Sequence, residues 1–145
     1  MLKWFCAAYT AMILSGCSAP MQITNNRPHG LQIVRAVATE HNVSADLAEA
    51  VAIIESRGNC KARSDGGALG IMQVMPSTAR SVGVKGPMTD CTKGATAGVL
   101  YLRRAIDLHG NGCEGISAYA QGIDRPSKCL PYGRKVMKIL KGLEK

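Results

Sequence analysis

The chain has 145 residues, enough for one compact domain with its own hydrophobic core but hardly for two. Its formal net charge is +8, and almost none of that charge lies in the leader described next, so the rest of the chain favours anionic partners. Nucleic acid is not expected among them, because the N-terminus indicates export.

The first residues have the pattern of a secretory leader. Lys3 provides a short positive start, and residues 4–14 are largely apolar and carry no charge. This run is too short to span a bilayer as a stable anchor, so we expect a signal peptide over residues 1–16 rather than a membrane helix.

The end of the leader, Leu14-Ser15-Gly16-Cys17, is similar to a bacterial lipobox. That resemblance implies cleavage before Cys17 and acylation of this cysteine. An ordinary secreted protein cleaved after Ala19 is the alternative, although it would begin at Pro20, which that route tolerates poorly. Ser18 is not the aspartate that retains lipoproteins in the inner membrane. We therefore expect a periplasmic protein held by lipid on the outer membrane.

The segment 17–30 contains several Pro and Asn residues and predicts a short tether. The remaining residues, 31–145, predict one domain that is mostly helical. In its first helix Leu31, Val34 and Ala38 share one face, as expected of a helix that packs on a core.

The second helix carries the most informative residue of the chain. Ser44 is a suitable N-cap, and Asp46 in the first turn complements the helix dipole. The apolar stripe consists of Leu47, Val51 and Ile54. Glu55 falls beside this stripe, in line with the small residues Ala48 and Ala52. Small neighbours leave space above a carboxylate, as a substrate cleft requires.

Pro76 suits the first turn of a short third helix, and Asp90 can cap a fourth that runs to about His109. Gly94 and Gly98 lie one turn apart in the fourth helix and predict close packing against another helix. Two shorter helices are expected over residues 114–120 and 132–143. No alternation of period two demands a sheet, so the predicted fold is all-α with about six helices.

Four cysteines remain beyond the leader and the lipidated residue: Cys60, Cys91, Cys113 and Cys129. An even number in an oxidising compartment predicts two disulfides, with three pairings possible. We favour Cys60–Cys91 with Cys113–Cys129, because each bond would tie a loop beside the expected site. No C-x-x-C spacing occurs and the histidines are scattered, so no metal is expected.

Three motifs occur in a characteristic order: Glu55-Ser56, Gly70-Ile71-Met72-Gln73, and Ala118-Tyr119 with Gly122. Together they resemble the catalytic domain of the soluble-type (family 1, SLT) lytic transglycosylases, which are lysozyme-like enzymes. The resemblance covers roughly residues 31–140. It implies a lysozyme-like domain, here braced by the disulfides expected from the cysteine count, that cleaves the β-1,4 bond between N-acetylmuramic acid and N-acetylglucosamine in peptidoglycan.

The resemblance also implies the mechanism. Glu55 protonates the glycosidic oxygen and then removes a proton from the 6-hydroxyl of the same sugar, which closes onto the anomeric carbon and gives a 1,6-anhydro end. No second carboxylate and no cofactor is needed, because the nucleophile is already tethered. An acid near neutral pH needs a raised pKa, and we expect apolar burial against Ile71, Met72 and Val74 to raise that of Glu55.

The other site residues follow from the same resemblance. Ser56 is expected to orient the glutamate or the sugar, and Gln73 to bind saccharide groups around the cleavage point. Met72 is expected to line the cleft, and the hydroxyl of Tyr119 to contact Glu55.

One position departs from the family pattern Ala-Tyr-Asn-x-Gly. Here the asparagine position is Ala120, so a sugar contact is missing unless Gln121 replaces it from the next position. The departure puts substrate register or rate in doubt rather than the class of reaction.

Two other functions stay open at this point. A hydrolytic muramidase would need a second carboxylate across the cleft, for which Asp65 and Asp124 are candidates. A catalytically inactive lipoprotein that binds the wall is the other alternative, because the missing sugar contact at Ala120 can mark a site that has lost its activity. The expected partners are peptidoglycan strands and the membrane through the lipid at Cys17. A secretion, conjugation or phage apparatus that needs a gap in the wall is a further partner, with general wall turnover as the alternative role, and the sequence does not choose between these roles.

Overall fold

The computed structural model describes residues 27–145. The predicted signal peptide, Cys17 and the tether as far as residue 26 lie outside the described residues. The first helix begins at His29, ahead of the expected domain start at residue 31. Arg27 already bonds to the domain, because its Nε donates to the carboxylate of Glu49 at 2.8 Å.

Six helices follow one another along the described chain: α1 (His29–Glu40), α2 (Ala45–Ser56), α3 (Pro76–Ser81), α4 (Cys91–His109), α5 (Cys113–Gln121) and α6 (Pro131–Leu143). The predicted all-α fold with six helices is confirmed. The expected caps are also present: Ser44 Oγ accepts from the backbone N–H of Leu47, and Asp90 accepts from that of Lys93. None of the six is long and apolar enough to cross a membrane.

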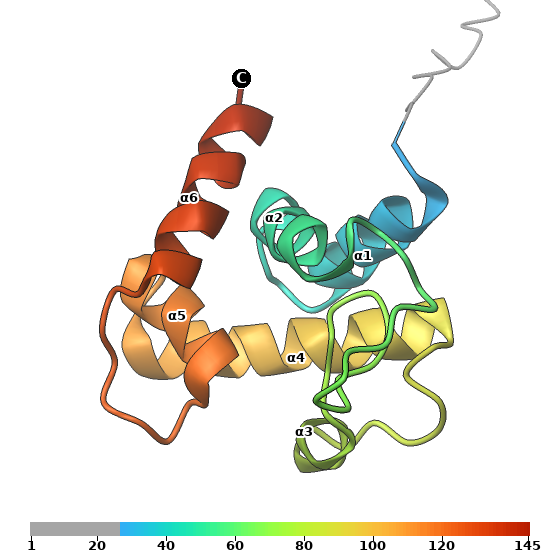
Figure 1. The fold of residues 1–145 in the computed structure, drawn as a ribbon. Coiled ribbons are helices and arrows are strands. Elements are labelled where there is room, and N and C mark those ends of the chain that lie inside the picture. The colour runs from blue at the N-terminus through green and yellow to red at the C-terminus, as the bar shows by residue number, and fades with distance from the viewer. Residues whose placement is uncertain (1–26) are drawn as a thin grey trace, which may run out of the picture.

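The long helix α4 runs across the domain (Figure 1). Helices α1 and α5 pack directly on α4, and α6 turns back to pack against both α5 and α2. The loop from residue 57 to residue 75 and the short helix α3 lie over the N-terminal half of α4. This arrangement places the end of α2 between the loop on one side and α6 on the other.

The core is formed by small and branched apolar side chains, which let the helices approach closely. Fully buried examples from three helices are Val34, Val51, Val99 and Leu102. Glu49 of α2 is only 2% exposed, and its carboxylate is neutralised by Arg27 and Arg35. A buried carboxylate without such partners would strongly destabilise the fold.

The two disulfides form in the favoured pairing. Cys60–Cys91 joins the loop after α2 to the start of α4, and Cys113–Cys129 joins the start of α5 to the segment before α6. The first bond therefore holds the loop after α2, and the second holds the segment that leads into α6, so the two bonds stabilise different sides of the domain.

The packing partner of the glycines in α4 differs from the prediction. A Cβ at Gly98 would lie 2.4 Å from Cβ of Met72, and a Cβ at Gly94 would lie 2.4 Å from the carbonyl oxygen of Met88. Met72 and Met88 lie in turns rather than in a helix. Gly98 thus makes room for the loop that follows α2, and Gly94 for the segment between α3 and α4, so the expected helix–helix contact is wrong.

This packing predicts opposite effects for two Gly→Ala changes in helices. Gly98→Ala forces Met72 to move and should lower the free energy of unfolding by about 1–3 kcal/mol. Gly142→Ala in α6 meets no atom within 4 Å and should leave stability unchanged or raise it by up to about 1 kcal/mol, because alanine is the better helix former. Urea unfolding of both variants measures the difference, and equal effects would contradict the packing described for Gly98.

Candidate active site

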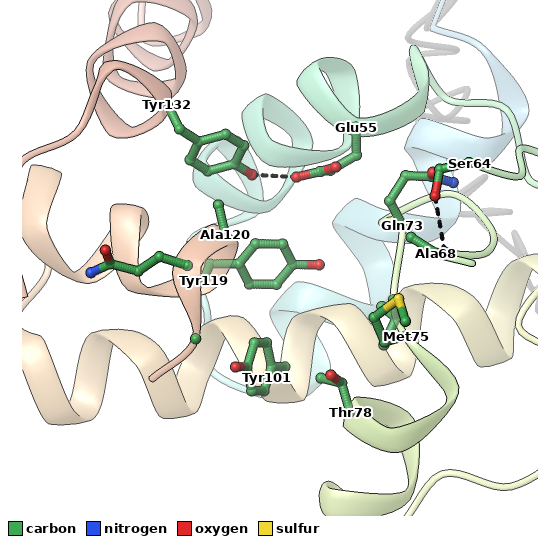
Figure 2. A pocket seen from close by; sticks show the side chains of 13 residues that line it. Glu55, Ser64, Ala68, Gln73, Met75, Thr78, Tyr101, Tyr119, Ala120 and Tyr132 are labelled. Carbon is green, nitrogen blue, oxygen red and sulfur yellow. Dashed lines mark hydrogen bonds between the residues drawn. The ribbon is translucent and has the colours of Figure 1, made fainter. Parts of the chain in front are cut away.

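A cleft of about 530 Å³ opens at the C-terminal end of α2. Its walls come from α2, α3, α4, α5, α6 and the loop before α3 (Figure 2). The side chains that matter for its chemistry are Glu55, Ser64, Gln73, Met75, Tyr101, Tyr119, Ala120, Gln121 and Tyr132. Glu55 is the only carboxylate that lines this cleft within the described chain.

Glu55 projects from the last turn of α2 toward α6. The hydroxyl of Tyr132 donates a hydrogen bond of 2.5 Å to its Oε1 (Figure 2). Burial raises the pKa of the Glu55 carboxyl above its usual value, and the bond from Tyr132 lowers it by a smaller amount. The expected raised pKa is therefore present, and Glu55 can hold a proton at a higher pH than an exposed glutamate.

The phenol that contacts Glu55 is not the expected one. Tyr119, predicted to make this contact, is 8% exposed, and its hydroxyl donates to the carbonyl oxygen of Met72 at 2.7 Å. Its ring packs against Tyr101 with centroids 5.5 Å apart. Tyr119 therefore connects α5 to the loop that contains Met72. Tyr132 lies 77 residues from Glu55 in sequence, and no local pattern could have paired them.

The Gly70–Gln73 turn is held against the end of α2. The hydroxyl of Ser56 donates to the carbonyl oxygen of Ile71 at 2.7 Å, so Ser56 fixes the turn and does not line the cleft. Gly70 has a φ of +77°, and a Cβ there would lie 1.9 Å from the carbonyl oxygen of Met88, so only glycine fits. Gln73 also has a positive φ, of 49°, and its side chain lines the cleft.

The methionine in the cleft wall is not the one that was expected there. Met72 is fully buried against Gly98 and does not line the cleft, so that prediction is wrong. Met75, which was not singled out, is 41% exposed and forms part of the wall. Of the three apolar residues expected around Glu55, only Val74 lines the cleft, whereas Ile71 is buried in the core with Met72.

Ser64 is a further residue that the sequence analysis missed. It lines the cleft on the loop side, and its Oγ accepts from the backbone N–H of Ala68 at 2.9 Å (Figure 2). The only signal in the sequence is its position in a Gly- and Ser-rich loop between two motifs. Such composition predicts a loop and does not distinguish one serine from another.

The wall opposite the loop contains the position that departs from the family pattern. Ala120 is exposed in the cleft and offers only a methyl group. Gln121 also lines it, with Nε2 3.4 Å from the carbonyl oxygen of Pro126. Asp65 and Asp124, the candidates for a second carboxylate, are not among the lining residues. Within residues 27–145 no three His, Cys, Asp or Glu side chains are grouped as metal ligands.

Comparison with known proteins places this geometry in context. The family described as "Transglycosylase SLT domain" matches residues 32–137. The transglycosylase of Enterobacteria phage PRD1 is 34% identical over 110 residues, which are 74% of this chain and 41% of the phage protein. The 70 kDa soluble lytic transglycosylase SLT70 of Escherichia coli superposes with a TM-score of 0.59 at 26% identity, over 77% of this chain and 18% of that one. The chain thus spans less than half the length of either protein.

The raised pKa of Glu55 predicts how stability depends on pH. The folded state holds the Glu55 proton more tightly than the unfolded state, so its contribution is favourable below the unfolded pKa of about 4.3 and is lost as pH rises through the folded pKa. Glu55→Gln should therefore melt at a higher temperature than the unaltered protein at pH 7. This advantage should disappear below about pH 4.

Calorimetric melting at both pH values tests this, with Glu40→Gln on an exposed side chain of α1 as the control. An advantage of the same size at both pH values would contradict the assigned cause.

Proposed function

The chain belongs to the transglycosylase SLT domain family, and from this premise we propose that it cleaves peptidoglycan as a lytic transglycosylase. The bond cleaved is the β-1,4 link from N-acetylmuramic acid to N-acetylglucosamine, and the products carry 1,6-anhydromuramyl ends. The observation that carries the proposal is the single carboxylate, Glu55, in the cleft of the described chain. One such group suffices for two proton transfers if the nucleophile belongs to the substrate.

Glu55 acts first as an acid and then as a base. The protonated carboxyl donates to the glycosidic oxygen, the bond from this oxygen to the anomeric carbon breaks, and an oxocarbenium-like sugar remains. The carboxylate then removes the proton from the 6-hydroxyl, whose oxygen bonds to the anomeric carbon. Glu55 ends the cycle protonated, as it began. Burial supports the first step, since it raises the pKa of the group.

Tyr132 serves the second half of the cycle. Its hydroxyl donates to Glu55 Oε1 and stabilises the carboxylate that exists between the two proton transfers. Gln73 from the loop and Gln121 from α5, which both line the cleft, contact the sugars. Ser56 and Tyr119 act indirectly, because each holds a carbonyl of the turn that carries Gln73.

A hydrolytic muramidase is less well supported. An inverting enzyme needs a second carboxylate about 6.5–9.5 Å from the first, and a retaining one needs it at about 5–5.5 Å. The tyrosines, glutamines and Ala120 that line the cleft with Glu55 offer no such group. A catalytically idle wall-binding protein is also less well supported, because burial and Tyr132 tune the Glu55 carboxyl as a proton-transfer group would need.

The place of action is outside the cytoplasm. Two disulfides and a domain of a peptidoglycan-cleaving family both suit an oxidising, wall-facing compartment. We further propose the lipid anchor at Cys17 on the outer membrane's periplasmic face. Local opening of the wall for a phage, conjugation or secretion apparatus is the biological role that we favour, and the likeness to a phage transglycosylase supports it.

Digestion of purified peptidoglycan tests the reaction. The unaltered protein should release fragments with anhydromuramyl ends, identified by mass spectrometry, and Glu55→Gln should reduce the rate by roughly 10²- to 10⁴-fold, as expected for loss of a general acid–base. Glu40→Gln serves as the matched control and should digest normally. Reducing ends would identify a hydrolase, and binding without cleavage by the unaltered protein would identify a wall-binding protein.

A further inference from the structure

The contact between Tyr132 and Glu55 depends on where α6 begins. Tyr132 is the second residue of α6, so a small movement of the first turn changes the distance from its hydroxyl to Glu55. The segment between α5 and α6 has no regular structure, and no side chain caps the start of α6. Another set of contacts must therefore fix this turn.

Ser117 supplies the central contact of that set. Its side chain is fully buried in α5, and its Oγ accepts a 2.9 Å hydrogen bond from the backbone N–H of Leu130, the residue just before α6. Leu130 is thereby held against α5, two residues before Tyr132. A buried hydroxyl with a backbone partner is costly to remove, because it leaves the N–H unsatisfied.

Two further features restrain the same turn. Gly133 lets α6 approach α5 closely, because a Cβ there would lie 2.3 Å from Ser117 Oγ and 2.5 Å from the carbonyl oxygen of Cys113. The disulfide Cys113–Cys129 ties the segment before α6 to the start of α5, and Arg134 of α6 donates to the carbonyl oxygen of Cys129 at 3.0 Å. We call Ser117, Gly133 and this disulfide the α5–α6 corner.

We propose that Ser117 is a positioning residue for proton transfer: as the centre of the α5–α6 corner, it sets where the Tyr132 hydroxyl meets Glu55. The effect of Ser117 on catalysis rests on the proposed function, whereas its effect on the position of Tyr132 does not. Ser117 does not line the cleft, so it acts through Tyr132 and touches no substrate. The Tyr132 ring is the link, since it extends from the first turn of α6 to Glu55 at the end of α2 (Figure 2).

The titration of Glu55 reports this role directly. The titratable residues that line the cleft with Glu55 are Tyr132 from α6, Tyr119 from α5 and Tyr101 from α4. Only Tyr132 bonds to the carboxyl, and this bond lowers the pKa of Glu55. Loosening the corner should weaken the bond and raise the pKa of Glu55 further.

The experiment is a double-mutant cycle read by NMR titration of the Glu55 side-chain carboxyl in the disulfide-bonded protein without substrate. Tyr132→Phe and Ser117→Ala should each raise the pKa of Glu55. Combining them should give no further rise beyond that of Tyr132→Phe, because Ser117 acts through the missing hydroxyl. Gly133→Ala disturbs the same corner from α6 and serves as a second variant if Ser117→Ala does not fold.

Ser44→Ala is the matched control. It also removes a serine hydroxyl that accepts from a backbone N–H, but at the far end of α2, so it should lower the melting temperature without moving the pKa of Glu55. A Ser117→Ala protein with an unchanged Glu55 pKa would overturn the proposal. The proposal would also be overturned if Ser117→Ala raised the pKa of Glu55 by the same amount in the Tyr132→Phe protein as in the protein that keeps the Tyr132 hydroxyl.

Activity gives a second, separate readout. The pH optimum for release of anhydromuramyl fragments should move upward in Ser117→Ala, and the rate at the original optimum should fall several-fold. The titration needs no turnover, so failure of the proposed reaction and failure of the positioning role are distinguishable.

Discussion

The site depends on one contact, the hydroxyl of Tyr132 against the buried carboxyl of Glu55. Burial favours the protonated form of Glu55, and the phenol favours the ionised form. In the proposed reaction Glu55 gives up a proton and takes one back in the same cycle, which needs both influences. Burial alone would raise the pKa, so that the carboxyl would release its proton less readily. Hydrogen bonding alone would lower the pKa, so that the carboxylate would rarely be protonated.

The rest of the structure fixes the positions of Glu55 and Tyr132 relative to each other. On the side of Glu55, Ser56 binds the carbonyl of Ile71 and Tyr119 binds that of Met72, so two consecutive carbonyls anchor the turn to different helices. Gly98 of α4 allows this turn to lie close to the long helix. On the side of Tyr132, the α5–α6 corner performs the corresponding task. Each side also contains one disulfide, so the cleft is braced across both of its walls.

The sequence predicted those features that depend on local patterns. Helix positions, the caps at Ser44 and Asp90, and the placement of Glu55 at the end of α2 follow from neighbours a few residues apart. Contacts between distant segments were not predictable in the same way. The pairing of Tyr132 with Glu55 and the contact of Gly98 with Met72 require knowledge of how helices cross.

The errors have a common physical origin. Met72 and Met75 differ by three residues in an irregular loop, where no helical or strand period states which side chain faces inward. Tyr119 and Tyr132 both offer a phenol to the same region, and only the path of α6 decides which one reaches the carboxyl. A motif therefore identified the region of the site, whereas the three-dimensional fold assigned the individual contacts.

The chemistry of the cleft walls indicates how a sugar can bind despite the alanine at position 120. Gln73 donates its amide to the carbonyl oxygen of Gly70, and Gln121 directs its amide to that of Pro126, so each side chain keeps its oxygen as an acceptor. The hydroxyl of Tyr101 already accepts from the backbone N–H of Ile123, which leaves its proton to donate. Glycans offer many hydroxyl and N-acetyl N–H donors that can meet these acceptors. In the proposed reaction, sugar binding can therefore rest on Gln73 and Gln121, while Glu55 carries out the proton transfers.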